Sequence, residues 1–485
     1  MTTIDNRHFL AVGDDGNYSK KGKYRSAPDQ VQLIVNHLKQ RQIKELSIYF
    51  HGGLVNELSA EKSITRVFEA LAQRNKPDSE ALSFIWKTGF LETVRDNLDE
   101  IFSSKFGRSL LKWAIRAVSK KLNVDLAKAG TNKGISLKEI EDEWEASTSE
   151  NRVPFRDLEI DTKSKAKGNT FSLSDEEDPD LEYEIRAELE QYYASQPSEW
   201  VEDWEAPPQN ITTSPDLNDV YETTLDGKKG IISVAKLAKA IAKISFRVIK
   251  RYAKDSDHGL QATVVEETCR AYFVSDAGQW VWGSMKQKAQ EMWLHPGCVG
   301  FDFMNLLQQE LPNLRLNLIG HSAGSIAICH FLGKKRQNHW KTTIEKILWW
   351  APACRADIFV QEVIHHDSDF DSFRMVTMTD PYELEDKLVN SLPWLYPSSL
   401  LYFISGVLEE EADEPIAGMA RYHINTKPYT SSVFTAMEEF LSKPGYRVLS
   451  KTEPDALPGF RSHALEHGAF NEDELTLQSL TRYLS

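Results

Sequence analysis

The segment Gly320–Gly324, GHSAG, is the part of this sequence with the clearest capacity for chemistry. It follows an apolar run, LNLI, and precedes the helical pattern SIAICHFL. The two glycines permit a sharp turn from strand to helix, which would lift the hydroxyl of Ser322 above a sheet as a nucleophile. The helix that starts there brings the N–H of Ala323 and the positive end of its dipole to the serine. The pattern therefore predicts a nucleophile elbow that includes His321; the alternative is a turn of small residues where a strand and a helix pack closely.

A second glycine turn, His51, Gly52 and Gly53, directly follows the apolar run LSIYF. Its backbone N–H groups and that of Ala323 would provide two donors to a developing oxyanion. Removal of one such donor commonly costs on the order of 3 kcal/mol of barrier. The alternative is an ordinary turn at the end of a strand, in which His51 satisfies local backbone groups. The pairing with Ser322 favours the catalytic interpretation.

With these two motifs the chain resembles the α/β-hydrolase superfamily, over roughly residues 40–90 and 298–485. The layout, including FIWKTGFLET and SLLYFISGVLE, is similar to that of poorly characterised bacterial members and identifies no substrate. In that superfamily an acid and then a histidine follow the serine along the chain. The resemblance therefore implies a triad that is completed downstream of Ser322.

The acid is expected after a late strand, and the run FRMVTMTD ends at Asp380. A parallel strand that ends there would deliver this carboxylate to the active edge of the sheet. The alternative is that Asp380 only caps the turn that Pro381 begins. Glu383 and Asp357 are the rival acids.

The base is expected between the last strand and the last helix, where SHALEHGAF contains His463 and His467. His467, which is followed by glycine, is the better placed. It would take the proton of Ser322 during attack on a carbonyl, and Asp380 would hold the imidazole in the useful tautomer. The sequence contains no HExxH, no calcium loop and no P-loop, so we expect neither a metal nor a cofactor.

The elements that must position these residues alternate between strands and helices. The predicted strands are 46–50, 82–86, 315–319, 346–350, 373–378 and 446–449. This alternation predicts an α/β fold with a mostly parallel twisted sheet flanked by helices, which is also what the α/β-hydrolase resemblance implies. The last helix is expected to begin at Asn471, with Glu474 as its reciprocal capping partner.

Charge marks the middle of the chain as an insertion. Thirteen acidic residues and one basic residue lie between Asp175 and Glu205, whereas the stretch 228–254 contains nine basic residues and no acidic one. We therefore predict three parts, namely residues 1–90 and 298–485 as the two halves of the hydrolase core and residues 91–297 as a large, mainly helical cap or lid.

Residues 231–254 predict a helix with cations along one face and apolar side chains along the other. Such a helix is typical of one that lies in a membrane interface, so we expect peripheral contact with anionic lipid. Residues 105–122 show the same pattern. The alternative is that both helices belong to an ordinary intramolecular cap and pair with the acidic segment.

Composition limits the remaining classes. The 485-residue chain carries a net charge of −15, which disfavours nucleic-acid binding by the body of the protein. Its four scattered cysteines predict neither a disulfide framework nor a zinc site. The sequence shows no apolar run long enough for a spanning helix and no secretory signal pattern. A cytoplasmic location is expected.

These observations predict a serine hydrolase that cleaves carboxylic esters through an acyl-enzyme, of lipase or phospholipase type. A cap of roughly 200 residues exceeds what exclusion of water from a small ester requires, which favours lipid esters as substrates. The same triad would serve a thioesterase, an amidase or a peptidase. Two further alternatives are a catalytically silent protein that binds a partner protein through the insert, and a toxin or defence effector whose hydrolase activity the cap controls.

Overall fold

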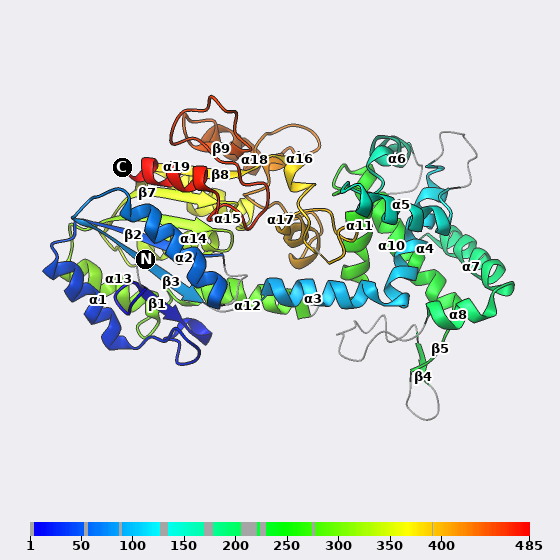
Figure 1. The fold of residues 1–485 in the computed structure, drawn as a ribbon, viewed down its shortest axis with the longest axis horizontal. Coiled ribbons are helices and arrows are strands. Elements are labelled where there is room, and N and C mark those ends of the chain that lie inside the picture. Colours follow the sequence, from blue (N-terminus) through cyan, green and yellow to red (C-terminus); the bar gives the residue numbers. More distant parts are fainter. Residues whose placement is uncertain are drawn as a thin grey trace. The chain divides into compact units, whose positions relative to one another are not determined.

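The computed structural model describes residues 4–52, 57–86, 90–126, 134–168, 178–204, 221–223, 229–273, 277–389 and 391–485. The chain divides into two compact units. Unit 1 comprises Met1–Glu92, Val281–Glu383 and Pro415–Ser485, and unit 2 comprises Thr93–Trp280 and Leu384–Glu414. Figure 1 shows that strands from distant parts of the chain, the blue β1 to β3 and the yellow β7 and β8, lie in one sheet of unit 1.

The sheet of unit 1 has seven strands in the order β1-β3-β2-β6-β7-β8-β9, and every neighbouring pair is parallel. The strands are β1 (Phe9–Val12), β2 (Glu45–Phe50), β3 (Ser79–Trp86), β6 (Arg315–His321), β7 (Thr343–Trp350), β8 (Phe370–Met378) and β9 (Arg447–Ser450). All residues of β2 are buried, so both faces of the sheet are covered, as all-parallel sheets require. Unit 1 is therefore an α/β structure.

Helices connect these strands in the alternation that the sequence predicts. The helices of unit 1 are α1 (Pro28–Gln40), α2 (Glu57–Ala72), α13 (Val299–Glu310), α14 (Gly324–Gln337), α15 (Ala356–Glu362), α16 (Asp380–Glu383), α18 (Ser432–Leu441) and α19 (Glu474–Leu484), and α12 (Ala277–Glu291) crosses the boundary between the units. Helix α2 packs against α19, whereas α15 packs against both α14 and α18. Each connection returns the chain to the same edge, so the carboxyl ends of all seven strands point the same way.

The order of the strands reverses between β2 and β6. From β2 the chain moves outward to β3 on one side, and from β6 it moves outward through β7 and β8 to β9 on the other. Phe50 at the end of β2 stands in register with Gly320 near the end of β6. Ligand sites of open parallel sheets lie at such switch points, outside the carboxyl ends of the strands. The turns after β2 and β6 therefore occupy the place where a site is expected.

All six predicted strands are present, and β1 is an additional strand that the sequence reading missed. Its four residues are too few for a recognisable period, although all four are buried. The predicted start of the last helix was wrong: α19 begins at Glu474 and its N-cap is Asp473, whose side chain accepts a hydrogen bond from the N–H of Thr476 at 2.9 Å. Asn471 lies two residues before this cap.

Unit 2 is mainly helical. Its helices are α4 (Lys105–Lys121), α5 (Leu137–Ser149), α6 (Glu159–Lys167), α7 (Pro179–Ala194), α8 (Pro197–Asp203), α10 (Val234–Ala253), α11 (Leu260–Thr268) and α17 (Leu400–Phe403), and α3 (Phe90–Ser103) crosses the first boundary. The short strands β4 (Tyr221–Thr223) and β5 (Lys229–Ile232) form an antiparallel pair.

The division into residues 1–90, 91–297 and 298–485 needs two corrections. The second boundary lies at Trp280, within α12, and Leu384–Glu414 belongs to unit 2 although it follows β8 of unit 1. Packing explains the second correction, because the ring of Trp394 stacks on that of Trp144 with centroids 4.2 Å apart. The hydroxyl of Tyr396 also donates a 2.5 Å hydrogen bond to the buried carboxylate of Glu266.

Helix α10 has the amphipathic pattern that was predicted for residues 231–254, but its apolar face lies in the interior of unit 2. The apolar residues Leu237, Ile241, Ile244 and Val248 are all fully buried. In this arrangement they are core residues of unit 2. Within the described residues, no helix combines the length and the apolar character that crossing a bilayer requires.

Candidate active site

Ser322 stands in a strained turn between β6 and α14. Its φ of +52° lies in the left-handed region, which costs a residue other than glycine roughly 1–2 kcal/mol. Two glycines allow this turn because a Cβ at Gly324 would lie 2.1 Å from the carbonyl oxygen of Phe50, and one at Gly320 would lie 2.8 Å from Cδ1 of Ile328. The predicted elbow residues therefore form a sharp strand-to-helix turn.

Hydrogen bonds hold the backbone of Ser322 on both sides. Its N–H donates to the carbonyl oxygen of Trp350 at 2.9 Å. Its own carbonyl oxygen accepts from the hydroxyl of Ser325 at 2.7 Å and from the N–H of Ala353 at 3.1 Å. These contacts fix the strained residue to the end of β7 and to the first turn of α14. Such strain persists where surrounding structure over-determines it, and it clusters at active sites.

His467 reaches this serine from a segment 145 residues further along the chain. Its Nε2 lies 2.9 Å from Oγ of Ser322, and both residues are buried. His467 belongs to the loop between β9 and α19, where the sequence predicts the base. A nucleophile within hydrogen-bond distance of an imidazole is the arrangement that general-base activation requires.

His321 supports the loop that carries His467. Its Nε2 lies 3.0 Å from the carbonyl oxygen of His467, and a carbonyl can only accept, so His321 carries a proton on Nε2. The two rings stack with centroids 5.5 Å apart. This elbow residue therefore couples the turn that holds Ser322 to the loop that holds the base.

The turn after β2 also meets the serine. The Nε2 of His51 accepts a 3.3 Å hydrogen bond from the N–H of Trp86, so the ring proton is on Nδ1 and is donated to the carbonyl oxygen of Gly52 at 2.9 Å. A Cβ at Gly52 would lie 3.3 Å from Cβ of Ser322. The satisfied ring of His51 matches the structural alternative for that residue, while the absence of a side chain at Gly52 gives the backbone close access to Ser322. Gly53 lies outside the described residues.

Burial keeps the two supporting imidazoles neutral. It lowers the pKa of both His51 and His321 to about 4, against an ordinary value of 6.5. Both rings therefore act at neutral pH as hydrogen-bonding groups without charge. A neutral surrounding does not repel the positive charge that His467 would gain on accepting a proton.

Ala323, the third predicted oxyanion residue, is the buried N-cap of α14. The first N–H groups of a helix have no partner within the helix and point outward along its axis. Together with the positive end of the helix dipole, the N–H of Ala323 beside Ser322 suits a developing negative charge. Its role as an oxyanion donor stays a prediction.

The three candidate acids occupy different surroundings. Asp380 follows β8, is one-third exposed, and receives a bidentate pair of bonds from Arg421, Nε to Oδ1 at 3.0 Å and Nη2 to Oδ2 at 3.3 Å. Glu383, at the end of α16, is fully buried. Asp357 is half exposed and pairs with Arg355 at 2.8 Å. Asp380 and Glu383 thus both stand after β8, and the role of Asp380 stays a prediction.

The other predicted base, His463, has an exposed side chain, and its backbone N–H donates to the carboxylate of Asp473 at 3.0 Å. Sequence reading missed Ser325 and Arg421. Ser325 could have been suspected because position i+3 from Ser322 lies on the same turn of helix. Arg421 follows Asp380 by 41 residues with no local signal.

No cluster of three or more metal-ligating side chains exists within the described ranges. Comparison of the chain with family models, with curated proteins and with solved structures found no match. The functional argument therefore depends on the geometry at the carboxyl ends of β2 and β6.

Proposed function

We propose that unit 1 is a serine hydrolase of the α/β-hydrolase type and that it cleaves carboxylic esters through an acyl-enzyme. The observation that carries this proposal is the 2.9 Å contact between Oγ of Ser322 and Nε2 of His467 at a left-handed turn between a strand and a helix. A small-residue turn that only packs a strand on a helix would need neither the strained serine nor the imidazole beside it.

In the proposed reaction, His467 removes the proton of Ser322 as Oγ attacks the ester carbonyl. The N–H of Ala323 and the turn that begins at Gly52, where a Cβ would lie 3.3 Å from Cβ of Ser322, stabilise the oxyanion in this proposal. The imidazolium of His467 then returns the proton to the leaving alkoxide. Water, deprotonated by the same ring, releases the acid. The acid of the triad, which we assign to Asp380, orients His467 and stabilises its charged form.

Lipid esters remain the favoured substrate class. An insertion of roughly 200 residues is larger than the hydrolysis of a small ester requires. Unit 2, with Thr93–Trp280 and Leu384–Glu414, is of this size. The triad itself does not select among esters, thioesters and amides. The substrate class is therefore the part of the proposal that an assay must decide.

The test uses mixed phospholipid vesicles and measures released fatty acid and lysolipid by mass spectrometry. Wild type is expected to release both, and Ser322→Ala to release neither. Ser442→Ala, which removes a hydroxyl from an exposed site at the end of α18, is the matched control and should behave as wild type. Equal release by Ser322→Ala and wild type would contradict the proposal.

A further inference from the structure

Two basic helix faces in unit 2 differ in what their cations contact. On α4 the cations pair with acidic side chains of unit 2. The measured pairs are Lys105–Glu202 at 2.5 Å, Lys112–Glu141 at 2.9 Å, Arg116–Glu188 at 3.0 Å and Lys121–Asp178 at 2.9 Å. Three of these four acids, Asp178, Glu188 and Glu202, belong to the acidic segment between Asp175 and Glu205, which includes α7 and α8. The basic face of α4 is therefore largely neutralised within the unit, as the intramolecular alternative predicts.

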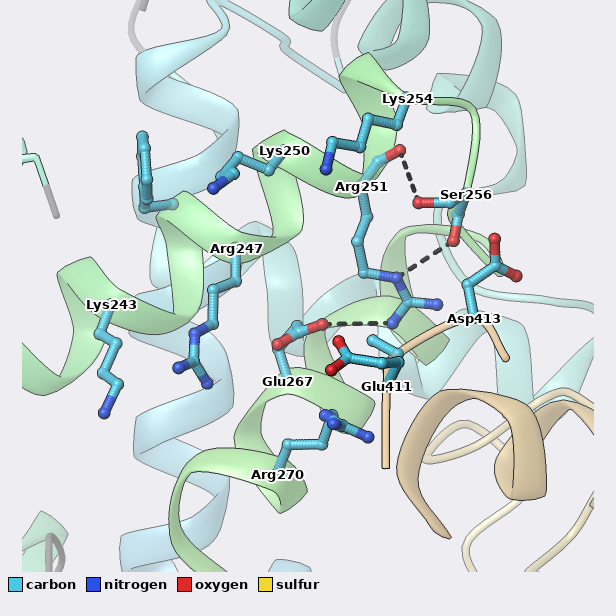
Figure 2. Close-up of a pocket in the computed structure, with 12 residues that line it drawn as sticks. Lys243, Arg247, Lys250, Arg251, Lys254, Ser256, Glu267, Arg270, Glu411 and Asp413 are labelled. Carbon is cyan, nitrogen blue, oxygen red and sulfur yellow. Dashed lines mark hydrogen bonds and ion pairs between the residues drawn. The ribbon is translucent and has the colours of Figure 1, made fainter. Parts of the chain in front are cut away.

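Five cations of α10 and its C-cap line a cavity of about 740 Å³. We define the basic pocket by its six cationic side chains, Lys243, Arg247, Lys250, Arg251, Lys254 and Arg270. Figure 2 shows them on α10 and at the end of the neighbouring α11, with Glu267, Glu411 and Asp413 as the acidic side chains of the lining. Cations outnumber acids two to one, in a cavity whose volume is typical of small-molecule sites.

Arg251 is the most buried cation of the basic pocket and is only 5% exposed. Its Nε donates to the carbonyl oxygen of Ser256 at 3.1 Å, and its Nη1 to the carboxylate of Glu266 at 2.5 Å and, more weakly, to that of Glu267 at 3.4 Å. Its Nη2 is buried and finds no hydrogen-bond acceptor in the described part of the chain. Burial of a guanidinium nitrogen without an acceptor costs free energy, and an oxygen of a bound ligand would supply the missing acceptor.

Two further cations at the pocket have no acidic partner. Among the residues that the structure describes, neither Arg247 nor Lys254 forms an ion pair, and the nearby Glu267 already accepts from Arg251. Arg270 is held in place by backbone carbonyls, including that of Glu409 at 3.0 Å. The basic pocket thus contains two cations that hydrogen bonds hold in place, Arg251 and Arg270. It also contains Arg247 and Lys254, whose charge no acidic side chain of the described residues neutralises.

The spacing of the cations indicates a ligand with several anionic groups. Positions 243, 247, 250 and 254 recur every three or four residues, so they follow one face of α10 over roughly 16 Å. Arginine guanidinium groups match the paired oxygens of phosphate better than a point charge does. We propose that the basic pocket binds a ligand that carries several phosphate groups, either a soluble polyphosphate or the headgroup of a phosphorylated lipid. Because the apolar face of α10 is buried, a lipid would be held by its headgroup.

Isothermal titration calorimetry of the full chain with inositol hexakisphosphate tests whether the basic pocket binds a soluble polyphosphate. We expect saturable binding that weakens as salt increases, and at least a tenfold larger Kd for Arg247→Gln/Lys254→Gln. These side chains are half-buried and exposed, respectively, so the variant keeps the buried Arg251 network. The matched control Lys138→Gln/Arg186→Gln removes two charges from exposed positions of unit 2 and should leave Kd unchanged.

Flotation with vesicles tests whether the basic pocket binds a lipid headgroup. Vesicles that contain phosphatidylinositol bisphosphate are compared with vesicles that contain phosphatidylserine at equal total charge. Preference for the bisphosphate lipid, lost in Arg247→Gln/Lys254→Gln, would assign the pocket to a headgroup. Binding of inositol hexakisphosphate without vesicle association would assign it to a soluble ligand. Absence of binding in both arms, or equal weakening by the pocket variant and the control variant, would overturn the proposal. Neither readout depends on ester hydrolysis, so its outcome is separate from that of the proposed function.

Discussion

The candidate active site of unit 1 and the basic pocket of unit 2 bury ionisable side chains in opposite ways. In unit 1, His51 and His321 beside Ser322 are buried as neutral rings, because burial lowers the pKa of each to about 4. In unit 2, Arg251 is buried as a cation. Burial by itself would lower its pKa, but the carboxylates of Glu266, Glu267 and Asp413 raise it above the ordinary value.

This difference indicates what each region is suited to do. The neutral rings of His51 and His321 do not oppose the positive charge that His467 would gain on accepting the proton of Ser322. Recognition of an anion needs positive charge that persists at every physiological pH, and a buried arginine held by Glu266 provides that. The substitutions below test whether the two regions respond as differently as this comparison requires.

The largest effect is expected for His467→Ala. Loss of the base should lower kcat for ester hydrolysis by roughly 10⁴–10⁶-fold with little change in KM, because the imidazole acts in the transition state. The matched control is His463→Ala, which removes an exposed imidazole from the same loop and should keep wild-type kcat. Steady-state kinetics with a soluble ester provides both numbers. Similar rates for the two variants would remove His467 from the mechanism.

The acid is tested by comparing Asp380→Asn with Glu383→Gln. We expect Asp380→Asn to lower kcat by roughly 10²-fold or more, since an amide cannot stabilise the imidazolium of His467, and Glu383→Gln to retain most activity. Asp357→Asn, which changes a half-exposed carboxylate, is the control. If Glu383→Gln is the inactive variant, the role passes to Glu383 and our assignment of Asp380 is wrong.

Arg251→Met should lower the free energy of unfolding of unit 2 by about 3 kcal/mol, because it leaves the buried carboxylate of Glu266 without its cation. Arg247→Met, on the same helix but without a buried partner, should cost less than about 0.5 kcal/mol. Urea unfolding monitored by exchange of α10 and α11 peptides separates unit 2 from unit 1. Equal costs for the two variants would contradict a buried charge network.

A further effect is an opposite dependence of the stability of the two units on pH. Between about pH 7 and pH 5 the unfolded chain protonates His51 and His321 while folded unit 1 does not, so its stability falls. Burial, with repulsion from Asp257, raises the pKa of Glu159 to about 7, so folded unit 2 takes up a proton before the unfolded chain does and gains stability.

Hydrogen exchange of peptides from β6 and from α10 at both pH values, corrected for intrinsic rates, measures this difference. Protection should decrease in β6 and increase in α10. Glu159→Gln should remove the increase in α10 and leave β6 unchanged. A change of the same sign in both units of the wild type would contradict the comparison.

Much of unit 1 could be predicted from the sequence, because its strands are short apolar runs and its reactive residues follow them directly. GHSAG and the HGG turn each lie beside a strand end, so the register of β2 with β6 brings them together. His467 was predictable because the chain order left one loop for the base. The contact of His321 with the backbone of His467 was not, since it joins two loops 146 residues apart.

Unit 2 was less predictable because amphipathic helices do not reveal which of their faces is covered. The cations of α4 and α10 have the same period, yet Arg116 of α4 pairs with Glu188 whereas Arg247 of α10 lines the basic pocket. The segment Leu384–Glu414 carries no local signal that it belongs with α5 and α11. Long-range packing, such as that of Trp394 on Trp144, decides both points.

The central claim is that Ser322 is a nucleophile activated by His467, and covalent labelling tests it most directly. The full chain is incubated with a small fluorophosphonate and the modified residue is located by peptide mass spectrometry. The account predicts one adduct, on Ser322, which is absent in Ser322→Ala and forms at least about a hundredfold more slowly in His467→Ala. Labelling of wild type at another residue, or labelling of Ser322 at the same rate in His467→Ala, would contradict it.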